Sequence, residues 1–257
     1  MTRLTPAEQL LQSLGVTEPK EIDLEAIAFH LGARVRYRAL DGCEARIIGS
    51  NNAAIITIGE NGKHSRQRFS LAHEIGHWTY HKGKTLVCRV EETNPQSALS
   101  PERVANLFAA DLLMPRYLFT PIARSHRRLT FKAVADVAAV FQTSLTSTAI
   151  RLVECGHSPA VLICHGKRGR RWFTRSPDIP RHWFPRDELD AESSAFDVLH
   201  GNKAAEAFPS KIGADAWFDR WNAERYMVQE QSIQTTSDEI LTLVLITDPA
   251  MLKESER

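Results

Sequence analysis

Residues 68–78 read RFSLAHEIGHW, and the spacing within this stretch limits what the chain can fold into. Its apolar positions recur at helical spacing, so an amphipathic helix with one buried side is predicted. In such a helix His73 and His77 lie on one face, with Cβ atoms roughly 5–6 Å apart. Two imidazoles at that separation can converge on one Zn²⁺ ion. The predicted buried side comprises Phe69, Ala72, Ile75 and Gly76.

The residues between and beyond these histidines have separate roles. Glu74 sits about 100° round the helix from His73, placed to take a proton from a water molecule rather than to chelate. Gly76 costs roughly 1 kcal/mol against Ala inside a helix, which predicts a close approach to the backbone there. His81 lies about 12 Å further along the axis and cannot bind the same ion. We expect it to face substrate, to support the site or to be exposed.

A third ligand must come from another segment, and residues 100–115 form a sharply bounded helix that can supply it. Ser100 is an N-cap, Pro101 occupies the first helical position and Pro115 ends the pattern. Glu102 and Asn106 are four apart on one face, as a ligand and the partner that orients the site would be. Glu102 could instead complement the helix dipole. Two acids in the preceding loop are alternative ligands, Glu91 and Glu92.

Residues 68–77 and the run from Glu102 to Pro115 together resemble the ImmA/IrrE metallopeptidases. The resemblance implies a zincin-like (gluzincin-like) domain with Zn²⁺ held by His73, His77 and Glu102, and with Glu74 as the catalytic acid/base. Many family members carry a second Glu where this chain has Val104, which leaves Glu102 as the acidic candidate in the signature.

The resemblance also implies a function, that of a zinc-dependent endopeptidase. Members of the family typically cleave helix-turn-helix (XRE-type) repressors in phage, mobile-element or stress-response circuits, so the implied partner is such a protein substrate. Three residues are candidates for stabilising the oxyanion or contacting the substrate, and the sequence does not choose among them: His81, Tyr80 and Tyr117. A rival hypothesis is a non-proteolytic anti-repressor with a structural metal. A closed structural site needs a fourth protein ligand, and no Cys or His falls naturally beside Glu102.

The first 60 residues predict two helices and a small sheet. The first helix spans residues 5–15. The second begins at Asp23, an N-cap, and ends at Gly32. Residues 35–37, 45–48 and 53–58 alternate as strands, with the turn at residues 49–52. We expect these strands to form a small antiparallel sheet. Its edge strand could bind an extended substrate, or the sheet could have a purely structural role. Ser65 is the predicted cap of the metal helix, which should run to about His81.

Residues 130–153 predict a helix, a short polar break and a second helix, similar to a helix-turn-helix. The exposed face that would contact DNA bases comprises Thr146, Ser147 and Arg151. It has a single basic residue, which is fewer than DNA-binding surfaces usually carry. A packing module or partner dock is therefore favoured over a DNA-binding regulator. The Gly and Pro at residues 154–159 mark a boundary, so the predicted domains are residues 1–120 (metallopeptidase), 121–155 (helical) and 156–257.

The last hundred residues predict a small α+β domain. A hairpin at residues 160–174, a helix at 191–199 and strands at 225–234 and 240–247 compose it. Some relatives in the resembled family carry a GAF-like sensory domain in this place, which makes sensing an expectation here. Four tryptophans could line a ligand pocket or form the core, namely Trp172, Trp183, Trp217 and Trp221.

Composition narrows the setting. The net charge of +1 comes from 32 basic and 31 acidic residues among 257, so the overall charge does not indicate nucleic-acid binding. Two short basic runs, at residues 124–128 and 167–171, are typical of solvent-exposed loops. The four cysteines are scattered, which favours reduced thiols and the cytoplasm. No apolar run approaches the ~18–20 residues that span a bilayer, so no membrane association is expected.

Overall fold

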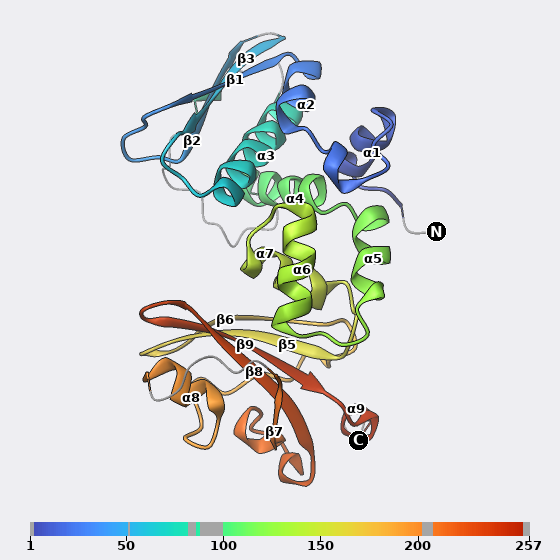
Figure 1. The fold of residues 1–257 in the computed structure, drawn as a ribbon, viewed down its shortest axis with the longest axis vertical. Coiled ribbons are helices and arrows are strands. Elements are labelled where there is room, and N and C mark those ends of the chain that lie inside the picture. Colours follow the sequence, from blue (N-terminus) through green and yellow to red (C-terminus); the bar gives the residue numbers. More distant parts are fainter. Residues whose placement is uncertain (1–2, 51, 82–85, 88–99, 202–207, 254–257) are drawn as a thin grey trace. The chain divides into compact units, whose positions relative to one another are not determined.

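The computed structural model describes residues 3–50, 52–81, 86–87, 100–201 and 208–253. Helices and two sheets alternate along the chain, which confirms an α+β protein (Figure 1). The chain forms two compact units. The first contains the chain to Pro121 together with Ala138–Ser144, and the second contains Ile122–Val137 and the chain from Leu145 onward.

The first unit combines helices with a four-stranded sheet in the order β1-β3-β2-β4. Strand β3 pairs antiparallel with β2, as predicted, but parallel with β1. The expectation of a purely antiparallel sheet is therefore wrong, because β3 is inserted between β1 and β2. The elements are α1 (Pro6–Ser13), η1 (Pro19–Glu21), α2 (Leu24–His30), β1 (Ala33–Arg38), β2 (Ala45–Ser50), β3 (Ala53–Gly59), α3 (His64–His81), β4 (Leu86–Val87) and α4 (Pro101–Leu113).

Helix α3 lies against strands β2 and β3, and Trp78 fixes it there. The Trp78 side chain is 1% exposed, and its Nε1–H donates to the backbone carbonyl of Leu31 at 2.9 Å. A Cβ added at Gly49 would lie 2.6 Å from the indole ring, so this position must be glycine for the ring to fit. The sequence pattern assigned Gly49 to the turn, whereas it lies inside β2.

Helix α3 begins earlier than its predicted cap. The carbonyl of Lys63 accepts from the backbone amides of Arg66 and Gln67, and the helix starts at His64. Ser65 therefore lies within the first turn, and the prediction that it caps the helix is wrong. Asp23 does cap α2, accepting from the amides of Glu25 and Ala26.

Helix α4 has the boundaries that the sequence predicts. The Ser100 hydroxyl accepts from the amide of Arg103 at 3.1 Å, and Pro101 occupies the first position. The close approach predicted at Gly76 is also confirmed. A Cβ there would lie 3.2 Å from both the Cα and the carbonyl oxygen of Ala105 and 3.3 Å from Cβ of Phe108. The two helices therefore cross backbone against backbone at this glycine.

Three helices follow: α5 (Arg116–Ser125), α6 (Phe131–Phe141) and α7 (Leu145–Glu154). Arg151 on α7 is 8% exposed, and Thr146 and Ser147 are half-buried. The predicted exposed reading face is therefore wrong at its one basic residue. No single helix among the described residues is long and apolar enough to cross a membrane; α6 and α7 meet that test only as a pair, which is bent by 107°.

The second unit is built on an antiparallel sheet in the order β6-β5-β9-β8-β7. Helix α7 packs on β5 and β6, and α8 packs on β8 and β9, so every residue of β5 is buried. The elements are β5 (Ala160–Gly166), β6 (Gly169–Arg175), α8 (Ser194–Leu199), β7 (Ser210–Gly213), η2 (Ala214–Ala216), η3 (Ala223–Arg225), β8 (Met227–Thr236), β9 (Glu239–Ile246) and α9 (Pro249–Lys253).

Because α7 packs on this sheet, the second unit begins before the predicted division at residues 155 and 156. A compact unit is not yet an independent domain, so the predicted domain boundaries stay a prediction. Helix α8 starts at Ser194 rather than at residue 191, because the Ser193 side chain caps it.

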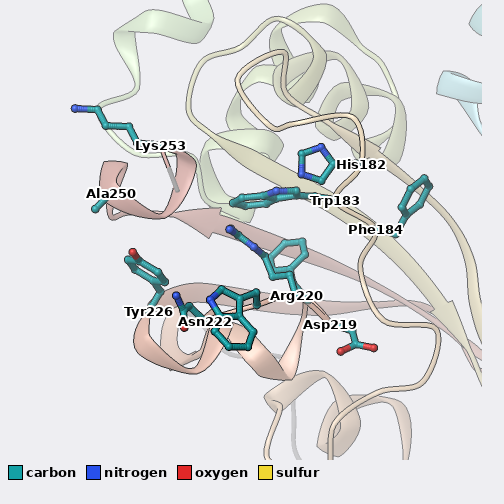
Figure 2. Close-up of a pocket in the computed structure, with 11 residues that line it drawn as sticks. His182, Trp183, Phe184, Asp219, Arg220, Asn222, Tyr226, Ala250 and Lys253 are labelled. Carbon is teal, nitrogen blue, oxygen red and sulfur yellow. The ribbon is translucent and has the colours of Figure 1, made fainter. Parts of the chain in front are cut away.

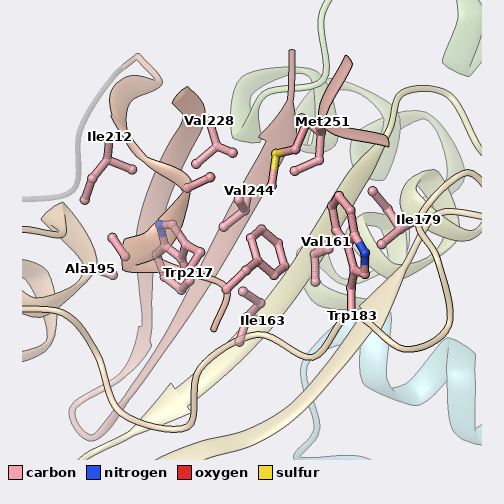
Figure 3. Packing of buried hydrophobic residues seen from close by; sticks show 14 of the residues in the cluster. Val161, Ile163, Ile179, Trp183, Ala195, Ile212, Trp217, Val228, Val244 and Met251 are labelled. Atoms are coloured by element: carbon pink, nitrogen blue, oxygen red, sulfur yellow. The ribbon is translucent and has the colours of Figure 1, made fainter. Parts of the chain in front are cut away.

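The four tryptophans divide between two environments. Trp183 and Trp217 are 3% and 1% exposed and belong to the core, where they pack with residues such as Val161, Ile163 and Val244 (Figure 3). Trp172 and Trp221 are exposed. The buried Glu230 carboxylate fastens α8 and η2 to this core. It accepts hydrogen bonds from the Ser193 hydroxyl, the Ser194 amide and Nε1–H of Trp217.

We expect the substitution Gly76→Ala to destabilise the fold by about 1–3 kcal/mol. In an open helix the same change would stabilise it by roughly 1 kcal/mol. Here the new methyl group meets the Ala105 backbone at 3.2 Å, and backbone cannot rotate aside. Urea denaturation of both proteins measures the difference.

The matched control is Gly62→Ala, because a Cβ there meets at close range only the Gln67 side chain, at 3.2 Å, and no backbone atom. We expect that variant to stay within about 0.5 kcal/mol of the parent. A Gly76→Ala variant as stable as the parent would show that the crossing is looser than described.

Candidate metal centre

His73 and His77 face each other from successive turns of α3. Their Nε2 atoms are 3.0 Å apart, and their rings meet edge to face with centroids 4.6 Å apart. His77 is buried and the His73 side chain is 17% exposed. His77 is therefore the deeper of the two ligands, and His73 is the more accessible one.

Glu102, in the first turn of α4, closes the group. One of its carboxylate oxygens, Oε2, lies 3.2 Å from Nε2 of His73, and the other, Oε1, lies 3.2 Å from Nε2 of His77. One ligand atom from each of the three residues lies within 4.8 Å of the others. Two imidazole nitrogens and one carboxylate are the donor set of many catalytic zinc sites, so these residues fit a metal ion.

Asn106, one turn further along α4, orients the first histidine. Its Oδ1 atom lies 2.9 Å from Nδ1 of His73. Because an amide oxygen can only accept, Nδ1 must carry the proton, which leaves the Nε2 lone pair for a metal. The four-residue spacing of Glu102 and Asn106 therefore places both on the histidine pair, as the sequence predicts.

Glu74 lies beside the group and is 4% exposed. Burial, and next the negative charge of Glu102, raises the pKa of the Glu74 carboxyl to about 7. Its Oε2 atom is buried without a hydrogen-bond partner among the described residues. A buried, unsatisfied carboxylate is costly, and such groups gather at functional sites. A cation bound nearby would lower this pKa, because it favours the charged form.

The other proposed site residues are placed as follows. Tyr80 is 46% exposed and its ring meets Phe108 edge to face, whereas the Tyr117 hydroxyl donates to the backbone carbonyl of Val16 at 2.8 Å. Tyr117 is thus occupied in fastening the loop after α1. The side chain of His81 lies outside the described residues, as do both alternative ligands, Glu91 and Glu92.

Sequence reasoning missed the residues that position α3 rather than those that carry chemistry. Gly49 and Leu31 seat Trp78, the residue that directly follows the second histidine. A glycine next to the alternating strand pattern was the available signal, but it reads equally well as part of the turn.

No curated protein matches the chain. Eleven chains of solved structures do, among them one described as "Mycobacterium tuberculosis transcriptional regulator". That structure is 10% identical, covers 93% of this chain and 74% of its own, and has a TM-score of 0.58. At this identity the likeness shows the fold alone.

The family model of the IrrE N-terminal-like domain, peptidase M78, matches residues 28–153. The match includes both helices of the site, α3 with its paired histidines and α4 with Glu102. This part of the chain therefore belongs to the ImmA/IrrE family of metallopeptidases, peptidase family M78.

Proposed function

We propose that this protein is a zinc-dependent endopeptidase. The observation that carries the proposal is the buried Glu74 carboxyl, whose Oε2 atom has no hydrogen-bond partner among the described residues, next to three converging ligand atoms. A purely structural metal site has no use for such a carboxylate, and a catalytic one needs a proton acceptor. The metallopeptidase family match supports the same conclusion.

His73, His77 and Glu102 would hold the zinc ion. When bound, zinc lowers the pKa of a coordinated water to about 7 and polarises the carbonyl of a peptide bond. Glu74 accepts the proton of the attacking water and then delivers it to the leaving amine. Its low exposure keeps bulk water from competing for that proton. Asn106 holds the His73 ring in the tautomer that leaves Nε2 unprotonated.

An extended polypeptide is the substrate class that suits the neighbouring sheet. Strand β4 is at the sheet edge, beside β2, and its residues lie between α3 and α4 in the chain. An edge strand offers backbone N–H and C=O groups that can pair with a substrate strand. We propose that an extended segment of the substrate pairs with an edge strand of this sheet.

The substrate we propose is a helix-turn-helix repressor of the XRE type, whose cleavage relieves repression. This rests on the family resemblance; the structurally similar regulator adds only a likeness of fold. We further propose that residues 156–257 act as a control domain, because some members of the resembled family carry a GAF-like sensory domain in this place. A cytoplasmic location fits Cys43 and Cys164, which form no disulfide among the described residues.

Glu102→Ala should abolish zinc binding at concentrations that saturate the parent, lowering affinity by more than about 100-fold. Asn106→Ala removes only the group that orients His73, so we expect a smaller loss, about 10–100-fold. Competition titration against a chromophoric zinc chelator measures both affinities.

Glu60→Ala, which removes an exposed acid from the same unit, is the control and should leave zinc affinity unchanged. If Glu102→Ala retains one tightly bound zinc per chain, the third ligand is not Glu102. Glu91 and Glu92 are then the residues to exchange next.

Glu74→Gln should lower the rate of peptide cleavage by about 10²–10⁴, because Gln cannot accept the proton of the water. Zinc content and fold should be unchanged, since Glu74 is not among the three converging ligands. The effect is measured by co-expressing each protein with a candidate XRE-type repressor and following the length of the repressor and the reporter output.

The same experiment separates cleavage from sequestration. Under the proposal, only the parent shortens the repressor and only the parent raises reporter output. Equal derepression by the parent and by Glu74→Gln, with the repressor intact in both, would mean that the protein acts as an anti-repressor and that the peptidase proposal is wrong.

A further inference from the structure

One face of the first unit's sheet is turned away from the helices that pack on it. Helices α2 and α3 contact strands β1, β2 and β3. Gly49 of β2 lies against Trp78 of α3. The Tyr37 hydroxyl of β1 donates to the Glu25 carboxylate of α2 at 2.9 Å. Because successive side chains of a strand point to opposite faces, the residues that alternate with Gly49 and Tyr37 point away from both helices.

Two isoleucines are exposed on this outward side. Ile48 of β2 and Ile55 of β3 are direct partners in the sheet register, and their side chains are 49% and 43% exposed. Their chain neighbours Ile47 and Ile56 point inward and are fully buried. Two large apolar side chains that lie side by side in water form a surface that another molecule can cover.

Arginines flank this isoleucine pair. The outward positions carry four of them, all exposed: Arg34, Arg36 and Arg38 on β1, and Arg46 on β2. Arg34 is the register partner of Ile55, and in the next row Thr57 lies between Arg36 and Arg46. Since neighbouring strands are about 4.8 Å apart, the backbones of Arg36 and Arg46 are about 10 Å apart, within reach of one bound segment. We refer to the four arginines and the two isoleucines as the outer sheet face.

Within the described part of the chain, none of these four arginines takes part in an ion pair. The outward positions of β1, β2 and β3 include no acid, and Glu44, just before β2, is paired with Arg66 of α3. Nε–H of Arg36 donates to the Thr57 hydroxyl at 2.9 Å, which orients the guanidinium and leaves its terminal N–H groups for a partner. An anionic partner would therefore meet attraction over the whole outer sheet face.

The cavity of about 960 Å³ in the second unit shows the opposite arrangement of cations (Figure 2). The guanidinium of Arg220 lies 4.0 Å from the centroid of the Trp183 ring and donates to the carbonyl of Met251. In Figure 2 Lys253 points away from Arg220. The cations of that cavity are engaged or diverge, whereas the arginines of the outer sheet face are adjacent and point to one side.

We propose that the outer sheet face docks an acidic amphipathic helix of a partner protein. The apolar stripe of that helix covers Ile48 and Ile55, and its carboxylates accept hydrogen bonds from the arginines. An apolar centre with arginines beside it is the composition of protein–protein interfaces.

The form of the partner follows from the surface. The backbone groups of β3 already pair with β1 and β2, so this face offers side chains, whereas an added strand would need a sheet edge. A helix with its side chains is about 10 Å across, which matches the separation of Arg36 and Arg46. A nucleic acid would satisfy the arginines but leave the isoleucines uncovered. The inference does not depend on the proposed peptidase activity.

The test titrates the intact chain into a fluorescein-labelled helical peptide and follows fluorescence anisotropy. The probe has about 18 residues, with leucines at helical spacing on one face and glutamates on its flanks. We expect saturable binding with a Kd on the order of 10 µM. Raising the salt from about 50 mM to about 300 mM should weaken it several-fold. A peptide with glutamine in place of every glutamate should bind at least about 10-fold more weakly.

Variants of the chain locate the binding surface. The double variant Arg34→Gln, Arg46→Gln should weaken binding about 10-fold, because two charge-assisted contacts are lost. Arg116→Gln is its control, since Arg116 is an exposed arginine of the same unit on α5. Ile48→Thr keeps a β-branched residue in β2 and should weaken binding about 3-fold or more. Phe29→Ala, which removes a side chain 71% exposed on α2, should leave binding unchanged. Circular dichroism of each variant establishes that its fold is intact.

Three outcomes overturn the proposal. The first is the absence of saturable binding of the acidic peptide at concentrations on the order of 1 mM. The second is binding that the double arginine variant leaves unchanged, which would place the peptide elsewhere. The third is tighter binding of oligouridine, or of vesicles that contain phosphatidylserine, with loss of that binding in the same double variant. That result would assign the outer sheet face to nucleic acid or to a membrane surface. None of these results bears on zinc or on peptide cleavage.

Discussion

The backbone contact between α3 and α4 at Gly76 is the constraint on which the metal centre depends. An added Cβ would lie 3.2 Å from the Ala105 backbone, so at this crossing no side chain of α3 separates the two helix backbones. That distance lets the short Glu102 side chain, one turn before Ala105, reach the Nε2 atoms of His73 and His77 at 3.2 Å each. A wider crossing would leave three ligand residues that could not share one ion.

The sheet supplies the other half of this rigidity. Trp78 follows His77 directly, and its seat between Gly49 and the Leu31 carbonyl fixes the rotation of α3 about its axis. Helix rotation matters here because a turn of some tens of degrees would carry both histidines away from Glu102. The packing of α3 therefore holds Glu74 in a buried position where its Oε2 atom has no hydrogen-bond partner among the described residues, which is a costly arrangement.

In the second unit, buried tryptophan and glutamate side chains stabilise the core instead of a metal centre. Its core is organised around Trp183, Trp217 and the Glu230 carboxylate, which accepts from Trp217 and from the start of α8. Trp221 belongs to none of this packing, although it lies only a few residues from Trp217 in the chain. Composition therefore says little about a tryptophan's role, whereas the exposed fraction of its side chain separates core from surface positions.

The sequence by itself determined the elements of the site. Helical spacing placed His73 and His77 on one face, the Ser-Pro start bounded α4, and the cost of Gly76 predicted a close contact. These are local properties, governed by capping and periodicity within one helix. The tertiary structure alone decided which backbone Gly76 meets, the parallel pairing of β1 with β3, and the burial of Arg151, which removes the predicted reading face. It also decided the high pKa of Glu74, because that shift comes from burial and from Glu102 on another helix. Each of these depends on contacts between segments far apart in the chain, which no local pattern encodes.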